Sequence, residues 1–368
     1  MTASAYLDWN ATAPPRPEAA EAMAAALAHV GNPSSVHRAG REAKRMLERA
    51  RAQVAALIDA PPAYVTFTSG GTEANHLALR GFPERRLIVS AIEHDSVLAA
   101  ASDAALLPAT RDGVADLETL ERLLATDERP ALVSLMLANN ETGVLQPVAE
   151  AGQIAHRHGA LLHCDAIQAL GKISFIFSEL NCDLMTLSAH KIGGPMGVGA
   201  LIASPDLVVR PLQTGGGQER GRRAGTENLP GIVGFGAAAT RATSSEYERI
   251  AALRDTAERR LLALAPDAHI YGMNAPRLPN TICVAMQGVP AATQVMALDL
   301  DGVMVSAGSA CSSGKVKRSH VLAAMDVPAV LSECAIRISL GWSTSEAEID
   351  RLVEAWGALY ARLRSRAA

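Results

Sequence analysis

The sequence has no long hydrophobic run and no basic tract, and each absence excludes a class of protein. No apolar stretch approaches the roughly 18 residues that a membrane-spanning helix needs, and residues 1–10 lack the basic and apolar regions of a signal peptide. Lys and Arg residues are dispersed and the net charge is only −4, which argues against a nucleic-acid surface or a polybasic membrane anchor. We therefore expect a cytoplasmic protein that binds neither nucleic acid nor a membrane.

Paired cysteines are also absent. The five cysteines, at positions 164, 182, 283, 311 and 334, form no CxxC pair, which fits neither a disulfide framework nor a structural zinc site. Cys311 differs from the others because it lies among small and polar residues with Lys315, Lys317 and Arg318 nearby. Positive neighbours lower the pKa of a thiol and favour the nucleophilic thiolate. The other four lie in apolar or helical stretches, and we expect them to be small core residues.

The chain is long enough for one large core and a smaller second one, because single cores stop growing at roughly 250–300 residues. Apolar, β-branched segments at 64–68, 85–91, 131–137, 160–165 and 183–189 alternate with helical patterns such as 41–58. This alternation predicts an α/β fold with a mostly parallel sheet covered on both faces by helices. A composition shift near Thr243 divides the chain into a large domain, 14–243, and a smaller α/β domain formed by 1–13 and 244–368.

Polar side chains gather where these predicted strands end. Lys191 follows the segment 183–189 and stands between Ser188, His190 and a run of glycines. Such a lysine suits a Schiff base with an aldehyde cofactor, although a solvated surface lysine has the same local sequence. Because parallel strands end at one edge of a sheet, this cluster should also include Asn140, Asp165 and Gln168, and we expect Lys191 to be its only lysine.

Two further strand ends point to ligand binding. The strand at 64–68 breaks at Gly70 and Gly71 and restarts as a helix, so unpaired backbone N–H groups and the Thr72 hydroxyl can bind an anion. The spacing matches neither GxxxxGK[ST] nor GxGxxG, which disfavours nucleotide loops, and a plain turn with a helix cap explains it too. His94 follows the next strand, where open α/β sheets bind ligands.

Together these residue types predict pyridoxal phosphate. A carboxylate such as Asp165 can keep a pyridine nitrogen protonated, an amide such as Gln168 can hydrogen-bond a phenolic oxygen, hydroxyls can bind phosphate and a lysine can bind the aldehyde. Individually, Asp165 could be a helix cap and Gln168 an exposed helix residue. Arg337 lies in an apolar segment and, if buried, needs an anion, either a substrate carboxylate or a structural ion-pair partner.

The motifs resemble those of the cysteine desulfurases, a family within the fold-type I pyridoxal-phosphate enzymes, over nearly the whole chain. The matching segments, in order, are YLDWNAT, NPSSVH, FTSGGTEAN, EHDSV, NNETG, HCDAIQALGK, SAHKIGGPMGVGAL, RRAGTEN, SAGSAC and IRISLGW. The resemblance implies a seven-stranded, mostly parallel sheet in the large domain. Two departures are Ala13, where many members have a threonine, and the basic segment after Cys311, which bears on the identity of the sulfur acceptor.

The resemblance also implies a role for each candidate residue. Lys191 would bind the cofactor aldehyde, Asp165 its ring nitrogen and Gln168 its phenolic oxygen, while His94 would stack on the ring and act in catalysis. The remaining implied cofactor residues are Gly71, Thr72, Asn140, Ser188, His190 and, reaching the neighbouring subunit of a homodimer, Thr226. The implied substrate residues are Arg337, Asn140 and Asn10. Cys311 would carry a persulfide, and would contact a metal only as the sulfur donor to an iron–sulfur cluster.

The activity implied by the resemblance is removal of sulfur from L-cysteine. Alanine leaves, and the sulfur stays on Cys311 until it passes to an iron–sulfur scaffold or another acceptor protein. Two alternatives stay open. A selenocysteine lyase or aminotransferase on the same scaffold would need no reactive thiol at Cys311, and a non-catalytic scaffold would only bind a sulfur-relay partner.

Overall fold

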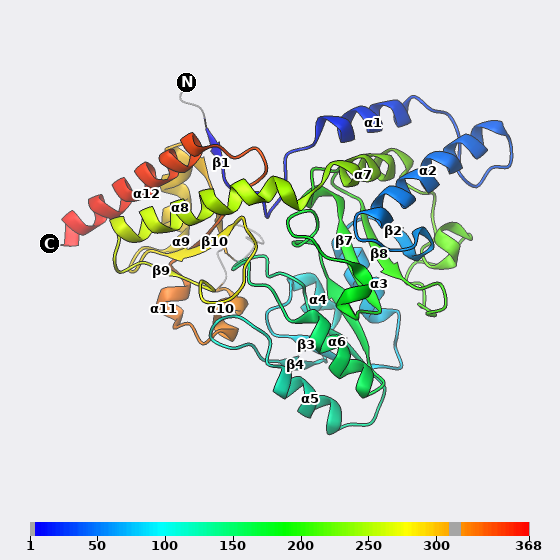
Figure 1. Cartoon of the computed structure of the whole chain (residues 1–368), viewed down its shortest axis with the longest axis horizontal. Helices are drawn as coiled ribbons and strands as arrows, with labels where there is room; N and C mark the ends of the chain where they lie inside the picture. The colour runs from blue at the N-terminus through cyan, green and yellow to red at the C-terminus, as the bar shows by residue number, and fades with distance from the viewer. Residues whose placement is uncertain (1–3, 309–317, 368) are drawn as a thin grey trace.

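The computed structural model describes residues 4–308 and 318–367. Within these ranges a seven-stranded sheet is formed by β2 (Val65–Thr68), β3 (Arg86–Ser90), β4 (Ala105–Leu107), β5 (Ala131–Ser134), β6 (Leu161–Asp165), β7 (Leu184–Ser188) and β8 (Gly199–Ala203). Its order is β2-β8-β7-β6-β5-β3-β4 (Figure 1). Every neighbouring pair is parallel except those of β8, which runs antiparallel to β2 and β7. The predicted α/β fold with a mostly parallel, seven-stranded sheet is confirmed.

Helices cover this sheet because its strands are apolar on both faces. All residues of β2, β5, β7 and β8 are buried, as expected when neither face meets water. The covering helices are α1 (Pro17–Leu27), α2 (Arg38–Ala56), α3 (Gly71–Arg80), α4 (Asp95–Ala100), α5 (Leu117–Ala125), α6 (Val148–Arg157) and α7 (Leu229–Arg241). Helices α1 and α2 both pack on α7, and Figure 1 shows the three grouped beside one end of the sheet.

The remaining elements surround a second hydrophobic core. Its strands are β1 (Ala5–Tyr6), β9 (His269–Ile270), β10 (Thr281–Ala285), β11 (Val303–Met304), β12 (Ser306–Ala307) and β13 (Ala335–Ser339). Its helices are α8 (Glu248–Leu264), α9 (Ala291–Leu300), α10 (His320–Ala324), α11 (Ala329–Ser332) and α12 (Glu346–Ala367). Strands β12, β13, β10 and β9 form an antiparallel sheet. No helix within the described ranges is both long and apolar enough to span a membrane.

The N-terminal residues belong to this second core. Strand β1 pairs in parallel with β11, and Ala5 and Leu7 are buried with side chains from residues 247–359. Figure 1 shows β1 beside α8 and α12, far in sequence from both. The chain therefore begins on the small sheet, crosses to the large one and returns after α7.

Local differences from the predicted elements have simple causes. Helix α2 begins at Arg38, earlier than the apolar pattern indicates, because the His37 ring caps it by accepting a hydrogen bond from the Gly40 N–H at 3.2 Å. Histidine is not among the preferred capping residues, so the pattern gave no signal. Residues 303–307 form two short strands, β11 and β12, which pair in different sheets. Strand β8 was not anticipated because it directly follows the glycine run.

A buried ion pair anchors the long glycine- and arginine-rich loop that precedes α7. Both Arg51 guanidinium nitrogens Nη1 and Nη2 lie 2.8 Å from the Glu219 carboxylate, which also accepts from the Phe67 N–H at 2.9 Å. Glu219 and Arg220 have φ values of 45° and 56°, a region that residues other than glycine rarely adopt. The ion pair therefore holds a strained turn of the loop against β2.

We expect Arg51→Met to lower the free energy of unfolding by about 3–5 kcal/mol, because it leaves the Glu219 carboxylate buried without a positively charged partner. Urea denaturation of the purified protein measures this. Arg45→Met is the matched control, since Arg45 pairs with Glu42 on the exposed face of the same helix and should contribute less than about 1 kcal/mol. Equal losses in the two variants would contradict a special role for the buried pair.

Candidate active site

A cavity of about 440 Å³ lies at the edge of the large sheet where the parallel strands end. Side chains from the small sheet complete its wall. All predicted site residues within the described ranges except Thr226 line it, namely Asn10, Gly71, Thr72, His94, Asn140, Asp165, Gln168, Ser188, His190, Lys191 and Arg337. Thr226 is exposed in the loop before α7. The structure thus brings together the residues that the strand-end pattern grouped.

Lys191 occupies a short 3₁₀ turn, Ala189–Lys191, directly after β7. Its Nζ donates hydrogen bonds to the backbone oxygens of Asn10 at 2.5 Å and Ala11 at 2.8 Å. Burial, reinforced by the positive charge of Arg337, lowers the pKa of Lys191 to about 7. A lysine in this state has a large neutral fraction near neutral pH, and the neutral amine is the nucleophile that an aldehyde requires.

Asp165 ends β6 and is buried. Its Oδ1 accepts from the Ile167 N–H at 3.0 Å and its Oδ2 from the Asn75 side-chain amide at 2.8 Å. Burial raises the pKa of Asp165, although the Asn75 hydrogen bond and the nearby His94 act in the opposite direction. Each carboxylate oxygen has a second lone pair, so Asp165 retains the capacity to accept from a protonated ring nitrogen.

The hydrogen-bond partners of His94 assign its tautomer. His94 caps α4, where Nδ1 accepts from the Ser96 N–H at 3.1 Å. A backbone N–H can only donate, so Nδ1 carries no hydrogen and the neutral ring is protonated at Nε2. The Ser96 hydroxyl lies 2.7 Å from Nδ1 and accepts from the Asn75 amide, which also holds Asp165. Burial lowers the pKa of His94, which favours this neutral form.

The N-terminus of α3, Ser188 at the end of β7 and His190 just after it form a corner of the cavity that can bind an anion. Gly71 lies so close to Ile167 that an added Cβ would be 2.3 Å from the Ile167 Cδ1 atom. Glycine therefore lets the helix N-terminus, with its unpaired N–H groups, border the cavity. The His190 Nδ1 lies 3.2 Å from the Thr12 hydroxyl. Burial, and to a smaller extent positive charge at Lys191 and Lys172, lowers the pKa of His190 to about 4.

Arg337, on β13, has a structural ion-pair partner and also lines the cavity, so it fits both interpretations of its sequence context. Its Nη2 pairs with the Asp8 carboxylate at 2.8 Å and its Nη1 donates to the Asn140 backbone oxygen at 3.1 Å. Its Nε is buried and has no hydrogen-bond partner among the described residues. The guanidinium is thus a structural ion-pair partner that also lines the cavity, and its terminal nitrogens keep further N–H groups for an anion there.

Three polar residues that contact the cluster were missed by sequence reasoning. Asn75 and Ser96 connect Asp165 to His94, as described above. The expectation that Lys191 is the only lysine of the cluster is wrong, because Lys172 donates to the side-chain oxygens of Asn10 and Gln168. The one available signal was spacing, since Lys172 follows Gln168 by four residues and so returns to the same side of a helical turn.

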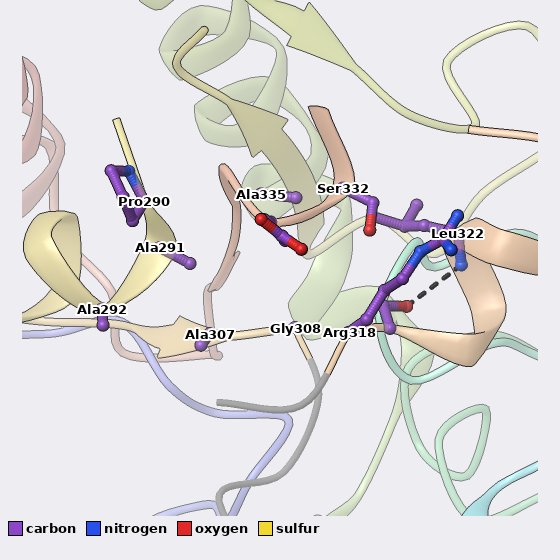
Figure 2. A pocket seen from close by; sticks show the side chains of 11 residues that line it. Pro290, Ala291, Ala292, Ala307, Gly308, Arg318, Leu322, Ser332 and Ala335 are labelled. Carbon is purple, nitrogen blue, oxygen red and sulfur yellow. Dashed lines mark hydrogen bonds between the residues drawn. The ribbon is translucent and has the colours of Figure 1, made fainter. Parts of the chain in front are cut away.

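A second cavity, of about 220 Å³, lies where the described chain stops before residue 309 and resumes after 317. Figure 2 shows Arg318, Leu322 and Ser332 on one side of it and Pro290 and Ala291 on the other. Gly308 borders both cavities. The predicted nucleophile Cys311 lies outside the described residues.

The four described cysteines are Cys164, Cys182, Cys283 and Cys334, and all are free thiols in the core. Their prediction as small core residues is confirmed. Burial raises the pKa values of Cys164 and Cys283 far above the usual value, which suppresses their thiolates. In the same ranges, no group of three or more His, Cys, Asp or Glu side chains could hold a metal ion.

The donors in the larger cavity fit pyridoxal phosphate. Lys191 provides a largely neutral amine, Asp165 a carboxylate with free lone pairs, and Gln168 an amide, all around one cavity. The N-terminus of α3, Thr72, Ser188 and His190 supply donors for a phosphate. Each functional group of the cofactor thus has a chemically matched residue.

Known proteins resemble the chain over its whole length. The family model of class V aminotransferases matches residues 5–352. A cysteine desulfurase of Cereibacter sphaeroides is 45% identical over 98% of this chain and 96% of its own, and cysteine desulfurase IscS of Dictyoglomus turgidum is 38% identical over 99% and 96%. The X-ray structure of a NifS-like protein from Rickettsia africae has a TM-score of 0.91 at 36% identity, over 98% of this chain and 100% of that one.

We expect the cofactor-free protein to take up pyridoxal phosphate at a rate that rises as pH increases through about 7, because Lys191 is protonated below that pH and neutral above it. An ordinary lysine would give a rise near about 10.4. Visible absorbance after mixing, followed from acidic to alkaline pH, measures the rate. Lys191→Ala should give no absorbance of the bound cofactor, whereas Lys44→Ala, at an exposed position of α2, should behave as wild type. A midpoint at the ordinary lysine value would contradict this assignment.

Proposed function

Because the chain belongs to the class V aminotransferase family and is a pyridoxal-phosphate-dependent cysteine desulfurase, we propose that Lys191, Asp165 and His94 perform the chemistry at the cofactor and that Cys311 receives the sulfur. The observation that carries this proposal is the single cavity that joins amine, carboxylate, imidazole and guanidinium groups. Its wall includes Gly308, three residues before Cys311.

When bound, pyridoxal phosphate supplies an electron sink for the bonds at the substrate Cα. Lys191 binds the cofactor aldehyde and, as a neutral amine, can accept the Cα proton at Nζ. Asp165 keeps the ring nitrogen protonated, and gaining this cationic partner lowers the pKa that burial raises. Gln168 would donate to the phenolic oxygen. His94 would stack on the ring and could offer a proton at Nε2, in line with its tautomer.

The substrate carboxylate binds at Arg337. The Arg337 guanidinium lines the cavity and keeps N–H groups beyond the two that pair with Asp8 and Asn140, and Asn10 and Asn140 flank the same part of the cavity. The phosphate would bind to Thr72, Ser188, His190 and the N-terminus of α3, which line the same cavity. This arrangement fixes a cysteine substrate by its carboxylate and leaves its sulfur free to react.

Cys311 is the proposed sulfur acceptor within the protein. Its thiolate attacks the substrate sulfur, so that an S–S bond forms while the substrate C–S bond breaks, leaving alanine and a persulfide. A chain of three residues spans at most about 11 Å, so Cys311 is within reach of the wall at Gly308. The burial of the other four thiols supports this choice. The persulfide sulfur then passes to an iron–sulfur scaffold or another acceptor protein.

We further propose a homodimer. Leu27, Val30, Val36 and Met196 are 70–88% exposed. Leu27 ends α1, Val30 and Val36 lie in the α1–α2 connection, and Met196 lies in the glycine run. A Cβ added at Gly234 would contact both Met23 of α1 and Pro195, so α1 and the glycine run lie close together. Exposed apolar clusters mark interaction surfaces. Thr226, exposed and outside its own cavity, would reach the phosphate site of the partner subunit.

The predicted division into domains 14–243 and 1–13 plus 244–368 is supported by the separate cores, since the N-terminal strand packs with residues beyond 247.

We also propose a cytoplasmic location. The four described cysteines are all unpaired thiols, as is usual in a reducing compartment.

We expect wild-type protein briefly exposed to L-cysteine without reductant to gain the mass of sulfur on Cys311, and to release alanine and, with reductant, sulfide. Cys311→Ser should keep the cofactor absorbance but form neither persulfide nor sulfide, because only the thiolate can accept the sulfur. Intact mass and peptide mapping locate the added atom. Cys334→Ser is the matched control at a buried thiol and should retain both products. Sulfur mapped to Cys164, or normal turnover of Cys311→Ser, would refute the proposal and favour a lyase or aminotransferase.

We expect sedimentation equilibrium to show a dimer, and Val36→Asp to raise its dissociation constant at least about tenfold, because a charge buried in an apolar interface costs more than about 1.4 kcal/mol. Cofactor affinity should fall with it, since Thr226 comes from the other subunit. Val330→Asp, at a valine that is 71% exposed on α11, is the control and should leave the dimer intact. An active wild-type monomer would rule out the shared site.

A further inference from the structure

Lys172 is a buried lysine that the proposed mechanism does not use. It is only 2% exposed and lies in the turn that follows β6, seven residues after Asp165. Lysine is among the residues least often found fully buried, and when it is, it usually pairs with a carboxylate. No ion pair of Lys172 occurs among the described residues, and its Nζ meets two amide oxygens instead. A buried lysine whose partners are uncharged needs a physical explanation.

The two contacts match the donor capacity of a neutral amine. Nζ donates to the Asn10 Oδ1 at 2.8 Å and to the Gln168 Oε1 at 2.7 Å. A neutral amine has two N–H groups, so both are satisfied. Burial, and then the positive charges of Lys191 and Arg337, lower the pKa of Lys172 well below the usual lysine value. Lys172 can therefore donate to the cluster without adding a cation beside Lys191.

These bonds fix the orientation of the Gln168 amide. Its Oε1 faces Lys172, and its Nε2 donates to the backbone oxygen of Asn10 at 2.9 Å. An amide nitrogen has two hydrogens, so one N–H remains for the cavity that Gln168 lines. Rotating the amide by half a turn would place Oε1 against the Asn10 oxygen, two acceptors, and would remove the acceptor from Lys172. Only one orientation satisfies all three groups.

Asn10 extends the same network to the reactive lysine. Its side-chain oxygen accepts from Lys172 and from the Asn280 amide at 3.1 Å, while its backbone oxygen accepts from Lys191 at 2.5 Å and from Gln168. Lys172 is thus connected through one residue to the amine that binds the cofactor and through another to the proposed phenolic-oxygen donor.

We propose that Lys172 is a positioning residue for the reaction, which orients the Gln168 amide toward the phenolic oxygen of pyridoxal phosphate and holds Asn10 beside Lys191. This inference rests on the proposed role of Gln168. Lys172 does not line the cavity and touches neither substrate nor cofactor in this arrangement. Its removal leaves the Gln168 Oε1 without a donor, leaves the Asn10 Oδ1 with the Asn280 amide alone, and frees the Gln168 side chain to turn.

The test is the pH titration of the visible absorption band of the cofactor-loaded protein, for Lys172→Met, Gln168→Ala and the double variant. Losing an N–H donor to the phenolic oxygen disfavours its deprotonated form, so the midpoint should move to higher pH. A shift of about one pH unit is expected for one hydrogen bond to a charged group. Both single variants should shift in this direction, and the double variant no further than Gln168→Ala alone. Lys44→Met, at an exposed lysine, should not shift.

The possible outcomes test the role of Gln168 and the role of Lys172 separately. If Gln168→Ala leaves the midpoint unchanged, the role of Gln168 in the proposed function is wrong. If Gln168→Ala shifts the midpoint while Lys172→Met does not, or if the two shifts add in the double variant, the positioning role of Lys172 is overturned. Thermal unfolding of the cofactor-free variants checks folding. Should Lys172→Met not fold, Lys172→Leu, which also has no donor, replaces it in the same cycle under the same criteria.

Discussion

The site depends on the hydrogen bonds of Asn10, because this residue joins the three parts of the chain that build the cavity. Its N–H donates to the Ser339 hydroxyl on β13 and its amide to the Thr281 hydroxyl on β10, both in the small sheet. Its backbone oxygen accepts from Lys191 and Gln168, which follow strands of the large sheet. A residue in the N-terminal segment thereby sets the spacing between the two sheets, and with it the geometry of the reactive amine.

Burial has the same electrostatic effect on four basic groups around this point. It is the largest cause of the lowered pKa values of Lys191, about 7, and His190, about 4, and it also lowers those of Lys172 and His94. Burial likewise favours the protonated form of Asp165. A ligand that brings a phosphate and a protonated ring nitrogen supplies the charges that these polar groups are arranged to meet.

The sequence predicted the parts of the site that depend on topology, and missed those that depend on side-chain packing. Strand ends are visible as apolar runs followed by polar residues, and parallel pairing must bring Asp165 and Lys191 to one edge. The Asn75–Ser96–His94 network joins residues of separate helices, and no local pattern encodes it. The burial of Lys172 has no local signal either, because lysine is usually a surface residue. Likewise, His37 caps α2 without belonging to the usual capping residues.

The two sheets contribute different halves of the proposed chemistry. The large sheet supplies the amine, the carboxylate and the anion-binding corner, whereas the small sheet supplies Arg337 and the chain that leads from Gly308 toward Cys311. Arg337 keeps an ion pair with Asp8, so its charge is balanced before a substrate carboxylate arrives, while its guanidinium still lines the cavity. Sulfur transfer needs the substrate clamp and the accepting thiol to meet the cofactor together. The Asn10 bridge fixes the small sheet, which carries Arg337, against the large sheet, which carries the reactive amine, and so sets the distance between the substrate clamp and Lys191.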